Sequence, residues 1–558
     1  MGLRTSRRVG SKCATALTAV ASMTFALTSC ALGEEVDPAQ ALVEHFAEAL
    51  DSNDVEGASS LTSYPNAASA TISQIFDGLQ AKSVDYKVSQ FIDLDDASGF
   101  FTLDAAWDFG ENRSWSYSSQ GSVRKLATGW RISWDPTVVM PDLGHGRSIH
   151  MVRTDAAPPR VLDTSGGVAL AEQTINAIKL DPTAMPDPAF STAALSKVIE
   201  PVAPLITAQS LMQDLVVAQG KPITAVSLRD DDFAVLESDL RAVPGVVVEK
   251  QPKLITTDRR IDSPLVGALR NVWQANRDAT AGWAVQMTQP DGPSTQYAGF
   301  QGPPGPDVAS TLDSKLQLAA TDAVVSVAQP ATIVVIQPST GAVLAVAQNS
   351  QANDKGPIAF TGLYPAGSNL DAIRAAAAVE KGVPLQDVKA EDTMQMASQL
   401  GLGVDFKVPG LTETTGRFPS PGKGMEPVRK EAPTRDDVMV SPFGMALVAA
   451  SIARGGAPAP MIAFGQPATT EAQLAPLRGD VVDRLRGLAK DGVGRPDMAS
   501  VRAYSDVVGL PGSAGDDQWF SGSKGDLAFS VYVQGAEGSD AAAKMSSRLF
   551  RAMSQPSE

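Results

Sequence analysis

The pattern of apolar and polar residues divides much of the chain into segments with helical or strand-like periodicity. Residues 38–50 place apolar side chains at helical spacing, and four polar residues end the pattern, which predicts an amphipathic helix. Residues 100–104 and 115–118 alternate as strands do. Together with the aromatic stretch at residues 129–136, these segments predict a small α+β domain over residues 36–143.

The middle of the chain, residues 146–310, is rich in proline and lacks one dominant period. Residues 160–167 combine a short apolar strand with turn residues, a combination that marks many hairpins. The Gly- and Pro-rich residues 299–306 indicate a linker.

The last part, residues 311–558, contains the clearest hairpin of the chain. Residues 333–336 and 343–346 are apolar runs rich in β-branched side chains, and turn chemistry ending in glycine separates them. Residues 527–533 predict a further strand, and a last helix from about 540 to 553 is expected to pack on the sheet.

The N-terminus has the composition of an export signal. A basic start is followed by residues 13–33, which carry no charge but are too short and too interrupted by Thr and Ser for a stable membrane span. The stretch holds Leu27-Thr28-Ser29-Cys30, which resembles a bacterial lipobox. The resemblance implies that residues 1–30 are a lipoprotein signal segment and that Cys30 becomes the lipidated first residue of the mature chain. Simple signal cleavage and an uncleaved anchor helix are the alternatives. All three place the rest of the chain outside the cytoplasmic membrane, and lipidation places it on the outer face.

Composition narrows the classes of function. At 558 residues the chain is long enough for several domains, and 43% hydrophobic with 19% charged residues suffices to bury ordinary cores. A net charge of −16 argues against nucleic acid as a partner and gives no support for electrostatic docking on anionic lipid. Cys13 and Cys30 are the only cysteines and lie in the export segment, so we expect neither disulfide nor thiol chemistry in the mature chain. With three histidines in the chain, we expect no metal site, and no residue pattern indicates a cofactor.

Residues 362–382 carry the most informative resemblance. A Pro-Ala-Gly turn precedes Ser368, and an Ala-rich helix follows it. This segment resembles the nucleophile segment of penicillin-binding transpeptidases, in which a Lys stands three residues after the Ser. In this chain that position is Asp371. The resemblance makes Ser368 the equivalent of the catalytic nucleophile and leaves it without the family's base.

The remainder resembles the layout of methicillin-resistance-type penicillin-binding proteins, which are monofunctional class B transpeptidases. Residues 36–143, with their Trp-x-Ile-x-Trp-x-Pro ending, resemble the cone-shaped α+β domain related to nuclear transport factor two. Residues 146–310 resemble a pedestal or dimerisation domain with a linker, and residues 311–558 a transpeptidase-like, β-lactamase-like α/β domain with a central antiparallel sheet. The resemblance implies an α+β multidomain fold, in which the hairpin of residues 333–346 is the sheet edge beside the active site.

The first catalytic motif is altered in its chemistry. An Asp in the first turn of a helix has its anionic form stabilised by the helix N-terminus, so Asp371 is a weaker base than a Lys, and it repels a carboxylate-bearing substrate. The sequence also allows a structural role, because Ser-Asn-Leu-Asp is typical of a capping box. In that interpretation, which we favour, the Ser368 side chain caps the backbone N–H of Asp371.

The second and third motifs are missing. No asparagine follows Asn369, so the family's Ser-x-Asn motif cannot occur in its usual order. Residues 400–401 resemble a Leu-Gly landmark that lies downstream of that motif in the family. Because few residues separate this landmark from Asp371, a deletion of the segment that lines the cleft would explain the missing motif. The landmark Trp519-Phe520 aligns Leu510-Pro511-Gly512 with the family's Lys-Thr-Gly. Pro511 also removes a backbone N–H from the strand that holds substrate. Lys524 lies in a hairpin turn, where an exposed lysine is ordinary.

A segment that forms the core in the family still has its family-like sequence in this chain. Residues 440–456 resemble the family's Thr-Pro-Leu-x-x-Ala helix with its Gly-Gly ending. We therefore expect a catalytically inactive homologue, a pseudoenzyme, that acts as a structural or regulatory partner of peptidoglycan synthesis or division proteins. One alternative is an active D,D-transpeptidase or carboxypeptidase in which a distant group such as Lys423 or Lys430 activates Ser368. Another is a module that binds peptidoglycan stem peptide or penicillin without covalent chemistry.

Overall fold

The structure, a computed structural model, describes residues 37–289, 292–418 and 437–554. The chain divides into two compact units, one of Met1–Val152 with Val285–Gly299 and the other of Arg153–Ala284 with Phe300–Glu558. In these described ranges, no helix has the length and apolarity needed to cross a membrane. The candidate lipidation residue Cys30 lies outside the described residues.

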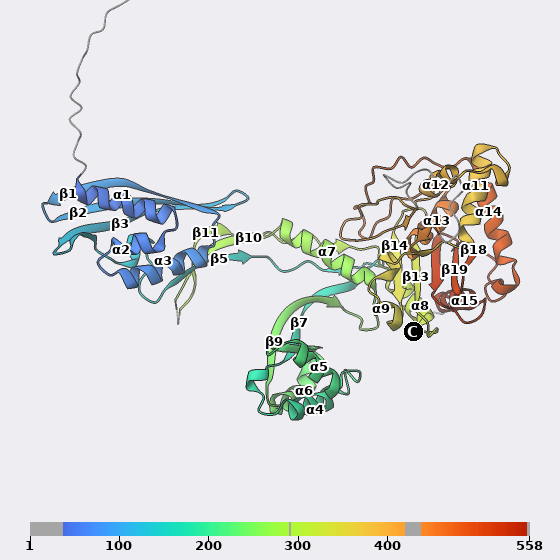
Figure 1. Ribbon diagram of the computed structural model, residues 1–558, viewed down its shortest axis with the longest axis horizontal. Coiled ribbons are helices and arrows are strands. Elements are labelled where there is room, and N and C mark those ends of the chain that lie inside the picture. The colour runs from blue at the N-terminus through green and yellow to red at the C-terminus, as the bar shows by residue number, and fades with distance from the viewer. Residues whose placement is uncertain (1–36, 290–291, 419–436, 555–558) are drawn as a thin grey trace, which may run out of the picture. The chain divides into compact units, whose positions relative to one another are not determined.

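The first unit packs three helices on one face of an antiparallel sheet with strand order β1-β2-β3-β4 (Figure 1). The predicted helix at residues 38–50 is confirmed, and Asp37 caps it by accepting a 2.8 Å hydrogen bond from the Ala39 N–H. The elements are α1 (Pro38–Asp51), α2 (Val55–Ser60), α3 (Pro65–Leu79), β1 (Ser83–Asp95), β2 (Ser98–Gly110), β3 (Arg113–Leu126) and β4 (Gly129–Ile132).

Aromatic side chains fill the space between this sheet and its helices. The Trp107 ring lies 5.3 Å from that of Phe76, centroid to centroid, and its Nε1 donates to the Tyr117 hydroxyl at 3.3 Å. The Tyr117 hydroxyl in turn donates to Val139 O at 2.8 Å and lies 3.1 Å from the Tyr86 hydroxyl. Because these polar groups are satisfied and buried, the interior is a packed core, and burial raises the pKa of both tyrosines.

Two further sheets belong to the middle of the chain. One has the order β11-β10-β5, and the other has the order β12-β6-β7-β8 with β9 also paired to β7. Helices α4, α5 and α6 pack on the second sheet around a core that includes Leu195, Leu211, Leu228 and Leu240. The elements are β5 (Ser148–Thr154), β6 (Val161–Leu162), β7 (Val168–Leu180), α4 (Pro188–Ile199), α5 (Ala208–Val217), β8 (Ile223–Arg229), α6 (Asp230–Ala242), β9 (Val246–Thr256), α7 (Pro264–Ala279), β10 (Gly282–Thr288), β11 (Thr295–Phe300) and β12 (Val308–Ala309).

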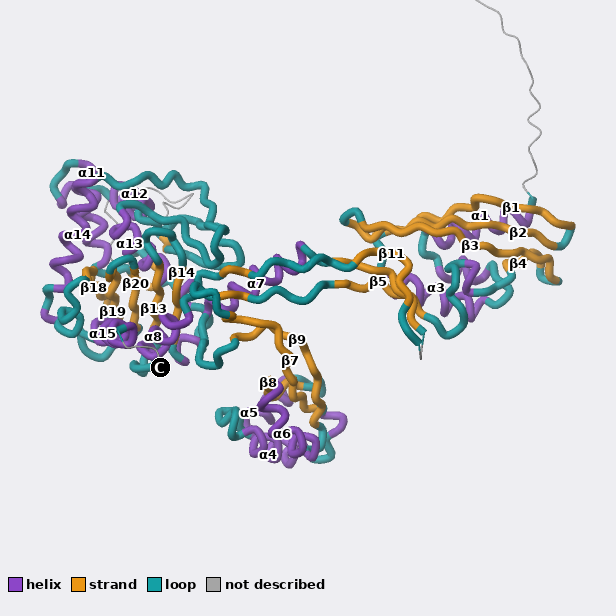
Figure 2. Tube along the Cα trace, turned by 180° about the vertical axis from the view of Figure 1, so that it is seen from behind, coloured by secondary structure: helices purple, strands orange, loops and turns teal. Residues whose placement is uncertain are grey.

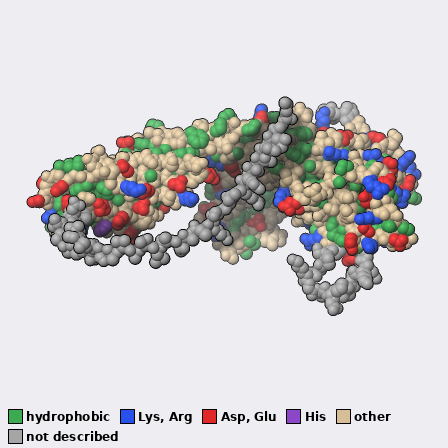
Figure 3. Space-filling model, turned by 90° about the horizontal axis from the view of Figure 1, so that it is seen from above, with side chains coloured by type: hydrophobic (Ala, Val, Ile, Leu, Met, Phe, Trp, Pro, Cys, Tyr) green, Lys and Arg blue, Asp and Glu red, His purple; other side chains and the backbone are tan. Residues whose placement is uncertain are grey.

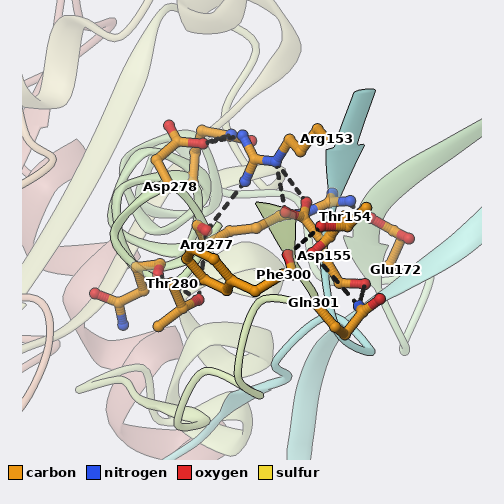
Figure 4. A network of polar contacts seen from close by, with 11 residues as sticks. Arg153, Thr154, Asp155, Glu172, Arg277, Asp278, Thr280, Phe300 and Gln301 are labelled. Atoms are coloured by element: carbon orange, nitrogen blue, oxygen red, sulfur yellow. Dashed lines mark hydrogen bonds and ion pairs between the residues drawn. The ribbon is translucent and has the colours of Figure 1, made fainter. Parts of the chain in front are cut away.

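A network of ion pairs ties the base of β7 to α7 (Figure 4). Arg277 donates to Asp155 at 2.9 Å and to Glu172 at 2.8 Å, and Arg153 donates to Asp155 and to Asp278, both at 2.6 Å. The side chains of Asp155 and Glu172 are only 13% and 17% exposed, so these pairs are partly desolvated. Loss of Arg277 would therefore take from Glu172 the arginine that it pairs with here, and would leave Asp155 with Arg153.

The last domain is built on an antiparallel sheet with the order β14-β13-β20-β19-β18. Helices α8 and α15 cover one face, while α11, α12, α13 and α14 pack against the other (Figures 1 and 2). The predicted hairpin, the strand at 527–533 and the closing helix are confirmed. The elements are α8 (Ser314–Val324), β13 (Ala331–Ile336), β14 (Val343–Gln348), α9 (Ser350–Asn353), α10 (Ile358–Thr361), β15 (Tyr364–Pro365), α11 (Asn369–Lys381), α12 (Ala390–Gln399), β16 (Gly416–Arg417), β17 (Met439–Val440), α13 (Pro442–Arg454), α14 (Gly479–Val493), β18 (Val507–Ala514), β19 (Asp517–Lys524), β20 (Leu527–Val533) and α15 (Ala541–Met553).

One expectation about this sheet is wrong. The hairpin β13–β14 does not border the Ser368 site, because β14 and β18 are opposite edges of the sheet and Ser368 contacts β18. The free side of β14 is instead covered by side chains. Gln317 donates to Val346 O and accepts from Val346 N–H, both at 2.9 Å, and the Ser263 hydroxyl also donates to Val346 O. The α+β multidomain fold class itself is confirmed.

Candidate functional site

A short strand and a glycine turn place Ser368 at the start of α11. Strand β15 pairs with β17, and the Ala366 N–H donates to Val438 O at 2.8 Å. Gly367 then turns the chain with φ +54°, and a Cβ at this position would lie 2.0 Å from Ser513 O. Glycine is therefore required both by the backbone conformation and by the close approach of β18.

Ser368 and Ser513 form a closed pair of hydrogen bonds. The Ser368 N–H donates to Ser513 O at 3.0 Å, and the Ser513 N–H donates to Ser368 Oγ at 3.0 Å. Acyl transfer at a serine needs N–H donors aimed at the developing oxyanion. The two backbone N–H groups of this pair would be the donors beside Oγ, and both are already engaged within the protein.

The capping-box interpretation of Ser368 is wrong. No hydrogen bond joins its side chain to the start of α11, and the Asp371 N–H donates at 3.2 Å to the backbone O of Ser368. The reason is conformational, since Ser368 already has helical dihedrals (φ −67°, ψ −9°), whereas a capping side chain needs an extended backbone to reach back to the first turn. The Asp371 side chain is exposed.

Strand β18 packs closely against α11 and α14 at two glycines. A Cβ on Gly512 would come within 2.3 Å of the Asn369 side chain, and a Cβ on Gly492 of α14 would come within 2.3 Å of Gly509 O. Ser513 directs its N–H towards Ser368, and strand alternation points Pro511, two residues earlier, the same way. Proline has no N–H to offer at that position.

A cluster of stacked aromatic rings lies under the segment that leads into Ser368 and packs on the sheet. Tyr532 stacks on both Tyr364 and Trp519 with centroid distances of 4.3 Å, and its hydroxyl donates to Asp517 at 2.7 Å. Burial, and secondly the charge of Asp517, raise the pKa of Tyr364 to about 12. Burial likewise raises the pKa of Tyr532, so neither tyrosine can act as a base near neutral pH. Sequence reasoning used Trp519 only as a landmark and missed this cluster.

The described residues bring no lysine to Ser368. Lys381 pairs with Asp392, Lys524 with Asp506 and Lys544 with Asp540. Lys423 and Lys430, the candidate distant bases, lie outside the described residues. Within the described ranges, the Ser513 N–H is the hydrogen-bond partner of Ser368 Oγ.

The region that would carry the second motif is short. Only residues 382–389 connect α11 to α12, and they lie at the far end of a 13-residue helix, about 20 Å from Ser368. Gly401, in the Leu-Gly landmark, has φ +92° just after α12. This geometry leaves that connection too far away to supply a side chain to Ser368.

A cavity of about 330 Å³ lies beside β18 but does not include Ser368 in its lining. Its polar lining includes Ser513, Gln518, Ser539 and the ion pair of Arg495 with Asp497. Elsewhere in the described residues, no group of three or more His, Cys, Asp or Glu side chains could hold a metal ion.

Comparison with known families identifies the first domain. Residues 38–147 match the family described as the NTF2-like N-terminal transpeptidase domain. No curated protein matches the chain. The match agrees with the α-helices and four-stranded sheet of the first unit, and it supports a penicillin-binding-protein-like layout for the chain.

Proposed function

We propose that the protein is an exported lipoprotein, anchored through Cys30 on the outer face of the cytoplasmic membrane, and a catalytically inactive homologue of penicillin-binding transpeptidases. Its role is structural or regulatory, as a partner of peptidoglycan synthesis or division proteins. The observation that carries the proposal is the closed pair of hydrogen bonds between Ser368 and Ser513.

Three independent changes oppose acylation of Ser368. Its Oγ accepts a hydrogen bond from Ser513, Asp371 stands where the family has its base, and Pro511 removes an N–H from the facing strand. Loss of one member of a nucleophile–base unit costs on the order of 10³ to 10⁶ in rate. The sheet, its covering helices and the buried α13 are kept, which suits a domain retained for contacts with other proteins.

Labelling with a fluorescent penicillin tests the proposal. The full chain and a Ser368→Ala variant are compared with a penicillin-binding enzyme that has all three motifs. We expect label on the enzyme and none on either form of this chain. Stoichiometric label that disappears in Ser368→Ala would make the chain an active enzyme with an unrecognised base. A shift of its melting temperature by penicillin without label would instead indicate a non-covalent binding module.

A further inference from the structure

Four large apolar side chains are exposed together at one end of the sheet in the first unit. We name Ile92, Leu94, Phe100 and Leu126 the tip patch, and they are 45%, 55%, 51% and 46% exposed. Figure 3 shows apolar side chains at the surface of this domain among acidic and a few basic ones. Isolated exposed apolar residues are common in proteins, whereas exposed apolar residues gathered in one place mark interaction surfaces.

Strand register places Ile92, Phe100 and Leu126 on the face away from the core, and Leu94 is exposed at a bulge at the same end of the sheet. Ile92 is the direct cross-strand partner of Phe100, and Leu94 follows at the β-bulge between Asp93 and Asp95, where its side chain is 55% exposed. Phe100 pairs with Ser122, four residues before Leu126 on β3, so Leu126 shares that face. The intervening residues Phe101 and Val123 point the other way and are buried, at 2% and 0% exposure.

The chain enters the domain at the same end. Asp51, the last residue of α1, accepts a hydrogen bond from the Tyr86 N–H near the start of β1. The 14 residues of α1 span about 20 Å, or about six strand residues, which brings the start of the helix level with Ile92. The β2–β3 turn lies at the opposite end, beside β11, where the Trp115 and Tyr297 rings are 6.3 Å apart. Figures 1 and 2 show that α1 begins at the end of the sheet away from β11.

The chain between Cys30, the candidate lipidation residue, and the start of α1 is short. Six residues lie between Cys30 and Asp37, the residue that caps α1, and the seven Cα-to-Cα steps can span at most about 25 Å. A lipid on Cys30 would therefore hold this end of the sheet near the bilayer surface, with the tip patch on the face opposite α1, about 10 Å farther from Asp37 than the tether itself reaches. Affinity of a surface element for the bilayer interface grows with the apolar area that it buries, and Phe100 adds an aromatic ring suited to the interface.

We propose that the tip patch is a membrane-docking surface that inserts into the interface of the bilayer to which Cys30 anchors the chain. This inference rests on the lipid anchor in the proposed function. Basic side chains do not exceed acidic ones around the patch, and Asp37 adds a further carboxylate at this end, so attraction to anionic lipid is not its source of affinity and docking should be no stronger on anionic than on zwitterionic vesicles. These side chains are Asp93, Asp95, Asp96, Arg124, Lys125 and Arg131.

An environment-sensitive fluorophore can test the docking. The full chain with Cys13→Ser is processed in a host that lipidates lipoproteins, labelled at Ile92→Cys with a nitrobenzoxadiazole dye, and reconstituted on phosphatidylcholine or phosphatidylglycerol vesicles. Ser116→Cys is the matched control, because Ser116 lies on the same face of the sheet towards its other end. We expect severalfold brighter emission and quenching by nitroxide lipids at position 92, and neither at position 116. The triple variant Leu94→Ser, Phe100→Ser and Leu126→Ser should abolish the quenching at position 92.

The possible failures are distinguishable. Chain that carries no lipid by intact mass and does not pellet with vesicles would overturn the anchor and the docking together. Lipidated chain that pellets while position 92 stays aqueous would overturn the docking alone. Protection of position 92 without quenching by nitroxide lipids would assign the tip patch to a protein contact and would also overturn it.

Discussion

Replacing Gly367 with alanine tests how tightly β18 is held against Ser368. Gly367 has φ +54°, and a Cβ there would lie 2.0 Å from Ser513 O, about 1 Å inside the closest approach that such atoms show. The left-handed conformation costs alanine about 1–2 kcal/mol. Relief of the clash moves β18 and breaks the two hydrogen bonds of the Ser368–Ser513 pair, at about 0.5–1.5 kcal/mol each. The expected loss of stability is therefore about 2–5 kcal/mol, the sum of these terms.

Gly382 provides the matched control. It ends α11 with φ +66°, and nothing lies within 4 Å of a Cβ at this position. Gly382→Ala should therefore cost only the conformational term, about 1–2 kcal/mol. Urea-induced unfolding measures both variants, and hydrogen exchange of residues 507–514 reports on β18 directly. Equal stabilities of the two variants, with unchanged exchange in β18, would refute the close packing of Ser368 against Ser513.

Three further outcomes follow from the same contacts. Asp371→Lys should leave the chain unlabelled by penicillin, because the Ser368 and Ser513 N–H groups stay engaged; labelling of this variant would show that the base alone was missing. Arg277→Met should lower the free energy of unfolding by about 2–4 kcal/mol, because Asp155 and Glu172 lose their shared partner, and a calorimetric change below about 0.5 kcal/mol would contradict this. Burial, opposed by a hydrogen bond from Phe406 and reinforced by Asp405, raises the pKa of Glu413 to about 7. A raised carboxyl pKa stabilises the fold at low pH, and that stability is lost as pH rises from about 4.5 to 7, by up to about 3 kcal/mol. Urea titrations across that range should show the slope in the natural chain and not in Glu413→Gln; equal slopes would contradict the shift.

The sequence predicts local structure better than it predicts the site. The hairpin at residues 333–346 and the amphipathic helix at residues 38–50 have periodicities that local chemistry alone enforces, and both are confirmed. The hairpin's own sequence does not show at which edge of the sheet it lies. That position depends on the pairing of β13 with β20, which is almost 200 residues later in the chain. The partner of Ser368 Oγ is likewise 145 residues away in sequence, so a local capping pattern was misleading.

Other features of the site and its surroundings needed the fold for similar reasons. Pro511 is visible in the sequence, but only the direction of its neighbour Ser513 shows that the missing N–H faces the site. The ion pairs of Arg277 join residues more than 100 positions apart, and no periodicity indicates them. The tip patch combines residues of three strands whose register sequence alone does not specify.

The rate of acylation of Ser368 tests the central claim most directly. The full chain is incubated with excess benzylpenicillin, and its intact mass is followed over hours beside the Ser368→Ala variant. The account predicts that both masses stay unchanged, because the hydroxyl, the base position and the oxyanion donors are all compromised. One penicilloyl adduct per chain that is absent from Ser368→Ala would contradict it.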